Sequence, residues 1–174
     1  MPEAQQSGSP FWRFSLQFYR MSGVADACIA LQDEAGVDVN LLLFLLWNAS
    51  MGRQLSRADV EDLERRVGEW REGVVVPLRE LRRRLKSPPS LIQPEAAEAY
   101  RMRIKQAELE AERLQQEALF ALSQAASLGR PALDGPAAAR DNVTAYQDIL
   151  RKQFSQAAVE TLLSAFGKIS DRAE

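Results

Sequence analysis

The most continuous hydrophobic run in the chain extends from Leu41 to Trp47, with no polar residue over two helical turns. A helix with this pattern has no face for water, so neighbouring elements must cover it on nearly every side. Asp38 suits its N-cap and Gly52 suits its C-terminal stop. Such a helix is shorter than the roughly 20 apolar residues that a bilayer span needs. We therefore predict the central core helix of a soluble bundle and no membrane span.

Two amphipathic patterns precede this core helix. Ser9-Pro10 supplies an N-cap followed by a proline at the first helical position, which predicts an aromatic-rich helix over 11–21. Over 24–35, apolar residues recur at steps of three and four, and Gly36 ends that helix. Three helices in close succession predict a compact aromatic-rich unit over 9–55, whose neighbours are antiparallel or steeply crossed.

Two longer helical patterns follow, over about 57–86 and 94–128. The apolar stripe of the first is Val60, Leu63, Val67, Trp70, Val74, Leu78, Leu81 and Leu85. Pro77 interrupts it and predicts a kink or break near 73–76, without a change of inward face because the stripe keeps its phase. The stripe of the second is Tyr100, Ile104, Ala107, Ala111, Leu114, Ala118 and Leu122. It is rich in alanine and would let a partner helix approach closely.

Further helices are expected over 137–170, and no run of strict alternation predicts a strand. We therefore predict an all-α fold, a single-domain bundle of six to eight helices over 9–170. The long helices within 56–128 are expected to form an antiparallel pair. Residues 1–8 are expected to be disordered, and 171–174 to form a tail.

Composition narrows the possible chemistry. Across 174 residues, the hydrophobic fraction of 46% and the charged fraction of 26% are ordinary for a globular protein. The absence of histidine removes Ser-His and Cys-His nucleophile pairs, histidine bases and histidine metal ligands. One cysteine excludes an internal disulfide and fits a reducing compartment, and the N-terminus does not resemble a signal peptide. We expect a cytoplasmic protein with no cofactor and no bound metal.

A basic helix face is the strongest charge feature, formed by Arg79, Arg82, Arg83 and Lys86. A basic stripe is one sign of nucleic-acid binding, but no aromatic residue interleaves with these side chains to stack on bases. The net charge of −2 also gives no general attraction to polyanions. Acidic residues on the following helix, Glu108, Glu110, Glu112 and Glu117, offer ion-pair partners. We therefore favour a salt-bridged face and expect no nucleic-acid partner.

Other polar positions allow both a structural and a functional interpretation. Cys28 lies on an apolar stripe and is best interpreted as a small buried hydrophobe. The acidic cluster that begins at Asp59 has spacing found in metal–diphosphate sites, but Ser56 and Asp59 also fit a capping box. Asn40 and Asn48 bracket the core helix, where amides serve either as helix-end hydrogen-bonding groups or as anchors in an apolar pocket. We favour the structural interpretation in each case.

A family resemblance rests on positions in the first third of the chain. They are Phe14-Ser15-Leu16, Tyr19, Gly23-Val24, Ala27-Cys28, Leu31-Gln32-Asp33, Gly36, Asp38-Val39-Asn40-Leu41-Leu42-Leu43-Phe44 and Trp47. On these residues the chain resembles a bacterial family of small all-helical proteins that is catalogued as a domain of unknown function. The match is concentrated in 11–56. It implies a bacterial, cytoplasmic protein, and it carries no catalytic or ligand-binding role onto any position.

Two functional hypotheses remain open. The first is a non-enzymatic protein–protein interaction or adaptor module that binds another protein or a second copy of itself. Its candidate residues lie off the main stripe of the second long helix: Leu109, Leu119 and Phe120. The second is a small-molecule-binding protein with an apolar pocket in the bundle. Its candidate residues are Trp12, Phe18, Trp47, Trp70 and Asn48. Catalysis by carboxylates, Lys, Tyr or Ser alone stays open, but no motif supports it.

Overall fold

The computed structural model describes residues 8–125 and 128–170. The chain divides into two compact units. Unit 1 comprises Met1–Glu64 and Gln116–Glu174, and unit 2 comprises Arg65–Gln115. The expected disordered N-terminus and C-terminal tail lie, apart from Gly8, outside the described residues.

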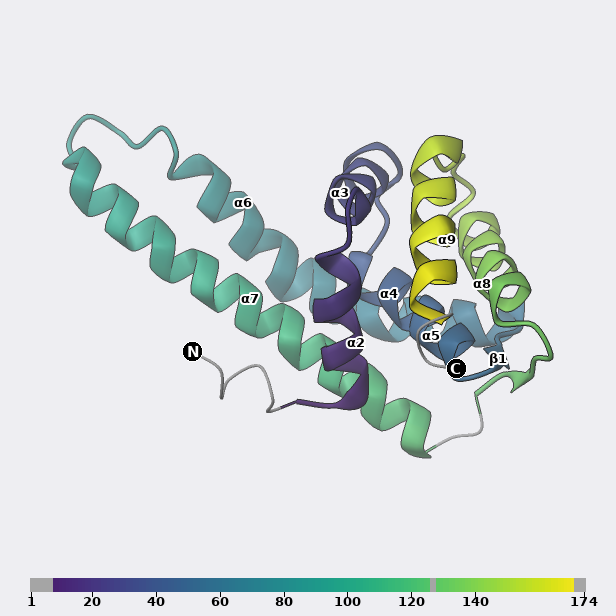
Figure 1. Ribbon diagram of the computed structural model, residues 1–174. Helices are drawn as coiled ribbons and strands as arrows, with labels where there is room; N and C mark the ends of the chain where they lie inside the picture. The colour runs from purple at the N-terminus through teal and green to yellow at the C-terminus, as the bar shows by residue number, and fades with distance from the viewer. Residues whose placement is uncertain (1–7, 126–127, 171–174) are drawn as a thin grey trace. The chain divides into compact units, whose positions relative to one another are not determined.

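Helices make up most of the described chain (Figure 1). In order they are α2 (Pro10–Tyr19), α3 (Val24–Ala35), α4 (Val39–Ser50), α5 (Arg57–Trp70), the π-helical segment η1 (Arg71–Val75), α6 (Val76–Arg84), α7 (Pro94–Ala125), α8 (Gly135–Leu150) and α9 (Gln156–Ser170). The regular extended structure in the described ranges is one antiparallel pair, β1 (Arg53–Gln54) with β2 (Arg130–Pro131). The predicted all-α bundle with long helices is therefore confirmed.

The apolar helix α4 is the core of unit 1, as its sequence predicted. Every residue from Asn40 to Ala49 is buried. The Asp38 side chain caps the helix by accepting the Leu41 N–H at 3.1 Å, and Gly52 follows with a φ of 69°. The most extensive neighbour of α4 is α8, and that of α3 is α9. The core helix is thus covered largely by the C-terminal part of the chain.

The short β1–β2 pair joins segments that flank α4 and α8, and it depends on a glycine. Gly129 has a φ of 68°, and a Cβ at this position would lie 2.5 Å from the Gln54 carbonyl oxygen. An L-residue would therefore be strained twice, by its backbone conformation and by this contact.

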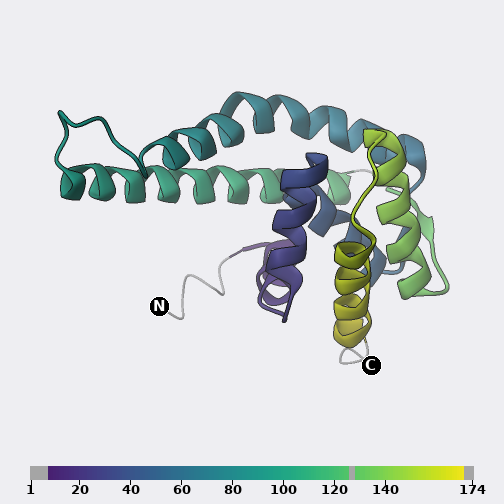
Figure 2. The same cartoon turned by 90° about the horizontal axis from the view of Figure 1, so that it is seen from above.

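The chain passes from α5 through η1 into α6 as one continuous helical ribbon (Figure 2). The expected irregularity near Pro77 is present, but it takes the form of a π-helical turn and not a break. The Val76 N–H donates to the Arg71 carbonyl, five residues earlier. Proline has no N–H and crowds the carbonyl four residues before it, here that of Gly73. A wider turn directly before Pro77 relieves that conflict.

The expectation that the inward face would keep its phase holds only in part, because Leu78 and Leu85 are half-buried beyond the proline whereas Leu81 is exposed. A π-helical turn contains an extra residue, which shifts the face that follows it toward the next position. Val75 is 2% exposed, whereas Leu81 of the predicted stripe is 38% exposed. One residue after Leu81, Arg82 is partly buried. The displacement brings arginine side chains to the inner side of α6.

Unit 2 is a helical hairpin in which α6 runs antiparallel beside α7 (Figures 1 and 2). The antiparallel direction is also clear from its contacts, because later residues of α5–α6 meet earlier residues of α7. Trp70 contacts Ala111, whereas Arg82 contacts Glu108. The boundaries of unit 2 fall within α5 and α7.

Candidate functional site

A buried asparagine joins α8 to α4 and β1 in unit 1. Asn142 is fully buried, and its amide donates to the carbonyls of Leu45 at 3.0 Å and Arg53 at 3.3 Å. Its Oδ1 accepts the Leu55 N–H at 2.8 Å. One side chain therefore bonds to three backbone groups and joins α8 to α4 and the β1 region. Sequence reasoning missed Asn142, although it is a lone polar residue on the buried face formed by Ala138 and Tyr146.

A buried tyrosine forms a second polar link in unit 1. The Tyr146 hydroxyl accepts the Asp38 N–H at 3.0 Å and donates to Glu64 Oε2 at 3.0 Å. Burial, followed by the negative charges of Glu64 and Asp38, raises the pKa of Tyr146 far above its ordinary value. The phenol stays protonated at physiological pH, so this group holds α8 to the start of α4 and does not supply a base.

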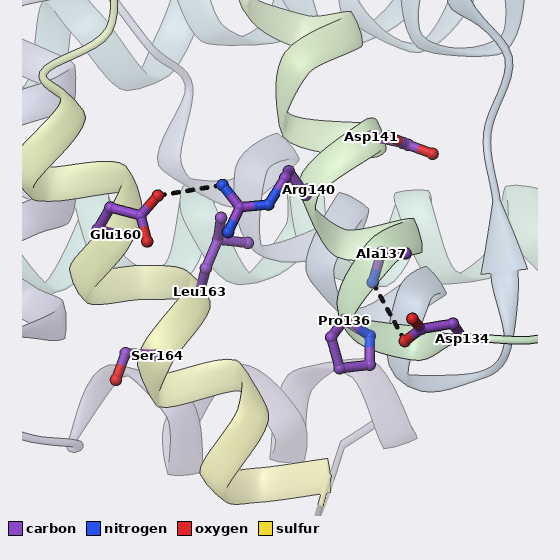
Figure 3. Close-up of a pocket in the computed structure, with 8 residues that line it drawn as sticks. All are labelled: Asp134, Pro136, Ala137, Arg140, Asp141, Glu160, Leu163 and Ser164. Carbon is purple, nitrogen blue, oxygen red and sulfur yellow. Dashed lines mark hydrogen bonds and ion pairs between the residues drawn. The ribbon is translucent and has the colours of Figure 1, made fainter.

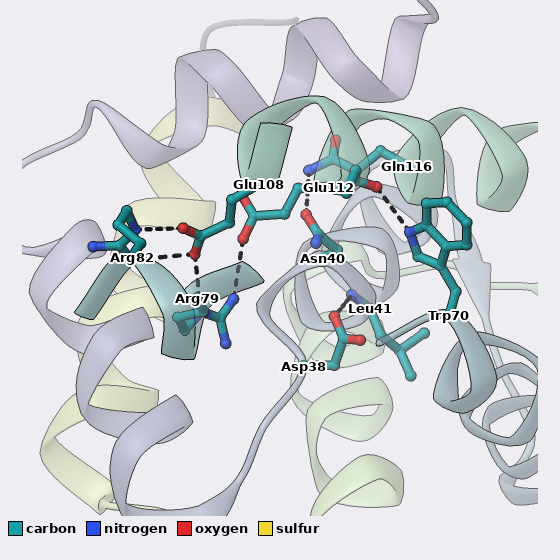
Figure 4. Close-up of polar contacts among 10 residues, drawn as sticks. Asp38, Asn40, Leu41, Trp70, Arg79, Arg82, Glu108, Glu112 and Gln116 are labelled. Carbon is teal, nitrogen blue, oxygen red and sulfur yellow. Dashed lines mark hydrogen bonds and ion pairs between the residues drawn. The ribbon is translucent and has the colours of Figure 1, made fainter. Parts of the chain in front are cut away.

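The two asparagines of α4 have internal hydrogen-bond partners. The Gln116 amide donates to Asn40 Oδ1 at 2.8 Å (Figure 4). The Asn48 amide donates to the Phe44 carbonyl, one turn earlier in the same helix, also at 2.8 Å. These bonds match the structural interpretation of both residues.

The five residues of the predicted small-molecule site occupy different surroundings. Trp47 packs against the rings of Phe11 and Phe44, with centroids 5.5 and 5.7 Å away. Phe18 stacks on its own helix neighbour Phe14, and Trp12 is half-buried on α2. The Asn48 amide donates to the Phe44 carbonyl within α4, and Trp70 belongs to unit 2. A ligand at these residues stays a prediction.

Two other interpretations from the sequence are confirmed. Cys28 is buried, and burial raises its pKa to about 12, so the thiolate form is scarce at neutral pH. Asp59 Oδ2 accepts both the Ser56 N–H and its hydroxyl, while the Ser56 oxygen accepts the Asp59 N–H. This reciprocal arrangement is a capping box at the start of α5.

An ion-pair seam joins α6 to α7 in unit 2, as Figure 4 shows. Arg79 donates to Glu108 at 3.1 Å and to Glu112 at 3.0 Å. Arg82 donates to both carboxylate oxygens of Glu108. Burial alone would raise the pKa of Glu108, but the hydrogen bonds and charges of Arg82 and Arg79 outweigh it and hold the pKa below its ordinary value.

The seam confirms that two of the four basic-face residues, Arg79 and Arg82, pair with acidic residues of α7. Arg79 and Arg82 have exposed side-chain fractions of only 18% and 21%. Arg83 and Lys86 are exposed near the end of α6. Because the two arginines that lie within the hairpin are neutralised by carboxylates, the four residues do not form one continuous cationic surface.

The three residues proposed for partner binding are placed in two different environments. Leu119 is 1% exposed, and Phe120 is half-buried with its ring 5.7 Å from that of Trp47. Both belong to unit 1, where they complete the aromatic core. Leu109 belongs to unit 2 and is 52% exposed. The three residues therefore do not form a common exposed face, because the last turns of α7 are part of a packed interior.

A different set of apolar residues is exposed on the hairpin. Leu81 of α6 is 38% exposed, and Tyr100 and Leu114 of α7 are 49% and 54% exposed. Trp70 is 37% exposed, and its indole N–H donates to the Ala111 carbonyl at 3.0 Å, one turn from Leu114. These residues together with the half-buried Ala107 are called the hairpin face. Its α7 residues belong to the alanine-rich stripe that the sequence predicted would let a partner helix approach closely.

The residues of the hairpin face lie on one side of the helix pair. Arg79 and Glu112 meet across the seam, and Leu81 and Leu114 follow them by two residues. Relative to the inward Arg82 of α6, Arg79 is turned by about 60° in one sense and Leu81 by about 100° in the other. Relative to the inward Glu108 of α7, Glu112 is turned by about 40° in the first sense and Leu114 by about 120° in the second. Because antiparallel helices wind in opposite senses when seen from one end, the two leucines share the side of the hairpin away from the Arg79–Glu112 pair. Tyr100 and Ala107 precede Leu114 by whole heptads and lie on the same side.

A shallow groove of about 420 Å³ lies between α8 and α9 in unit 1 (Figure 3). Its charged groups already have partners within the chain. Arg140 pairs with Glu160 at 3.0 Å, and Asp134 caps α8 by accepting the Ala137 N–H. Asp141 accepts from the Gln54 side chain at 2.6 Å. With these groups engaged, the groove offers no converging set of polar side chains for a ligand.

The described ranges contain no group of three or more cysteine and acidic residues arranged to hold a metal ion. Within the same ranges, every helix is too short or too polar to cross a bilayer.

Comparison with protein families places the chain in a family. The model of the family described as "Protein of unknown function (DUF2390)" matches residues 10–119, well beyond the 11–56 segment in which the resemblance was concentrated. Searches of curated proteins and of solved structures gave no match. The matched segment includes the core helix α4 and the whole of unit 2. The chain therefore belongs to the DUF2390 family of proteins of unknown function.

Proposed function

We propose that this protein is a non-enzymatic protein–protein interaction module and that the hairpin face is its docking surface. The supporting observation is that Leu81, Tyr100 and Leu114 lie on one side of the helix pair and that these three side chains and that of Trp70 are each more than a third exposed. Scattered apolar residues are normal on protein surfaces, but an aligned set indicates an interaction site.

The composition of the hairpin face suits protein recognition. Tryptophan and tyrosine are enriched at interfaces because they bury a large apolar area at little cost in conformational entropy. Ala107 lies between Tyr100 and Leu114 and allows a helix to approach closely. Behind this face, the bonds of Glu108 to Arg79 and Arg82 hold α6 to α7. A partner would therefore meet a preformed surface, and less ordering entropy is lost on binding.

Two features of unit 1 support the non-enzymatic part of the proposal. The buried hydroxyl of Tyr146 is held protonated between Asp38 and Glu64. The thiol of Cys28 is buried and protonated. Neither group offers a nucleophile or a base to solvent. A cytoplasmic location and a bacterial origin, both implied by the family resemblance, belong to the same proposal.

Site-specific photo-crosslinking in the cells that make the protein tests this function. A photoreactive amino acid is placed at Tyr100 or Leu114, and at Lys105 as a matched control. Lys105 is exposed on the same helix but about 140° from Tyr100. We expect a discrete crosslinked protein band from positions 100 and 114 and none from 105. Absence of any protein adduct at 100 and 114, with the helical circular dichroism of the variants unchanged, would overturn the proposal.

A further inference from the structure

The exposed stripe of α7 is symmetric about Ala107. Tyr100 lies seven residues before Ala107 and Leu114 lies seven residues after it. In an antiparallel pairing of two copies of α7, with Ala107 on the two-fold axis, Tyr100 of each copy would face Leu114 of the other. The alanines would meet at the axis, where a small side chain permits the closest approach of two helices. A surface of this kind is self-complementary, as a two-fold interface requires.

Two residues of opposite charge lie beside the stripe, one on each side of Ala107 along the sequence and at nearly equal separations from it. Arg103 lies four residues before Ala107, and Glu110 lies three residues after it. Their helical positions differ by about 20°, so both flank the stripe on the same side. Both are exposed, and neither makes an ion pair or hydrogen bond within the described part of the chain. The two-fold axis would place Arg103 of each copy beside Glu110 of the other.

We infer that the occupant of the hairpin face is a second copy of this chain, bound as a two-fold dimer through antiparallel α7 helices. The inference rests on the proposed function, since it names the partner of the same surface. The observation that favours self-association over another partner is the twofold match of unlike charges and of apolar side chains about Ala107. A surface evolved for an unrelated protein has no reason to be complementary to itself.

The strength of the dimer comes mainly from the apolar stripe. Exposed ion pairs contribute little to affinity, but like charges forced together oppose binding and therefore set orientation. By symmetry each charged pair occurs twice, so one substitution changes two contacts. A single charge reversal is therefore expected to weaken the dimer by at least about tenfold, which corresponds to about 1.4 kcal/mol.

Sedimentation equilibrium of the full chain, over a range of micromolar concentrations, tests this inference with four samples: the wild type, two variants and a mixture of the two variants. The wild-type chain is expected to approach twice its 19.5 kDa mass. Arg103→Glu and Glu110→Arg, each alone, are expected to remain monomeric at concentrations where the wild type dimerises. An equimolar mixture of the two variants is expected to regain the dimer, because positions 103 and 110 are both acidic in the first variant and both basic in the second. Thermal melts of each variant check that the exposed substitutions leave the fold intact.

The possible failures separate this inference from the proposed function. A wild-type chain that stays monomeric at every concentration would overturn self-association, and so would a dimer that both charge reversals leave unchanged. A mixture that fails to regain the dimer would overturn the antiparallel pairing. A photo-crosslink from position 114 to a different protein would support the interaction module while overturning the choice of partner. Loss of every protein crosslink would overturn both.

Discussion

The two units place polar and apolar side chains in opposite ways. In unit 1, the apolar helix α4 is buried all round, and the buried polar groups near it include the amide of Asn142, the phenol of Tyr146 and the carboxylate of Asp38 that caps the helix. In unit 2, ionised arginine and glutamate side chains lie between the helices, while Trp70, Leu81, Tyr100 and Leu114 are exposed. Unit 2 therefore places charged side chains between its helices and leaves apolar side chains exposed. It buries less apolar area than its sequence would allow.

This difference has an energetic consequence. Burial of apolar area is the dominant favourable term in folding, and unit 1 uses it fully. Ion pairs within a protein regain little more than the cost of removing both charges from water. Unit 2 is therefore expected to be the less stable unit and the more sensitive to pH. The apolar area that unit 2 leaves exposed is available for association.

The largest effect is expected from Asn142→Leu in unit 1. The leucine fills a similar volume but leaves the Leu55 N–H and the carbonyls of Leu45 and Arg53 without their side-chain partner. The Leu45 carbonyl keeps its helical partner within α4, but the other two groups lose theirs. Each unsatisfied group costs about 1–3 kcal/mol, so we expect a loss of at least about 2 kcal/mol in the free energy of unfolding. Urea denaturation followed by circular dichroism measures this change.

Thr144→Ala is the matched control for this substitution. Thr144 lies two residues further along α8 and is exposed. Its replacement is expected to change the free energy of unfolding by less than about 0.5 kcal/mol. A loss below about 1 kcal/mol in Asn142→Leu would show that water, or a backbone shift, satisfies the backbone groups instead.

The features of unit 1 that follow local rules were predictable from the sequence. Asp38 and Gly52 bound α4 as expected, because caps depend on a few adjacent residues. The all-round burial of α4 follows from its composition alone. The elements that cover α4 could not be predicted, because the periodicity of α8 does not indicate that Asn142 contacts α4. Contacts between segments far apart in the chain depend on tertiary geometry that hydrophobic periodicity does not encode.

A smaller effect is expected from Glu108→Gln in unit 2. The amide keeps the size of the side chain but removes the charge that pairs with Arg79 and Arg82. Hydrogen bonds to charged groups contribute about 1.5–3 kcal/mol, and partial exposure of the arginines reduces this contribution. We expect a loss of about 1–2 kcal/mol, measured as faster amide hydrogen exchange in α6. Glu80→Gln, an exposed change on α6, is the control and should leave exchange unchanged.

The same variant tests the pH dependence of the hairpin. The folded pKa of Glu108 lies below its ordinary value of 4.5. A carboxylate with a lowered folded pKa contributes stability that is complete above the unfolded pKa and is lost as the pH falls through the folded pKa. The wild-type hairpin should therefore lose exchange protection below about pH 4.5, and Glu108→Gln should lose less over that window. Equal acid sensitivity in the two proteins would show that another carboxylate is responsible.

The outward and inward faces of the hairpin were the least predictable part of the candidate site. Leu109, Leu119 and Phe120 were grouped because all three lie off the main stripe, yet two of them belong to the packed core of unit 1. Helical periodicity identifies a stripe but does not say which stripe is buried when two compete. In α7, Glu108 lies inward and Leu114 does not. Glu108 takes the inward position because Arg79 and Arg82 of α6 pair with it.

The smallest effect is expected from Pro77→Ala, which tests why α6 presents those arginines. Without the ring, residue 77 regains an N–H that can donate to the Gly73 carbonyl, so η1 can close into an ordinary α-helical turn. Removing the extra residue would rotate α6 by about 100°, moving Leu81 inward and Arg82 outward. Because this exchange trades an ion pair for apolar burial, the free energy of unfolding should change by less than about 1 kcal/mol.

Cysteine labelling reports that rotation directly. Cys28, the only natural cysteine, is buried and should not react, so a cysteine placed at position 81 or 82 reports its own exposure. In the Pro77→Ala background, we expect Leu81→Cys to react more slowly and Arg82→Cys more rapidly than in the parent chain. Pro94→Ala, at the first position of α7, is the control and should alter neither rate. Unchanged rates in Pro77→Ala would mean that the bonds of Arg79 and Arg82 to Glu108 hold the π-helical turn without the proline. The hairpin face would then be exposed because charge pairing, and not backbone sterics, fixes the register of α6.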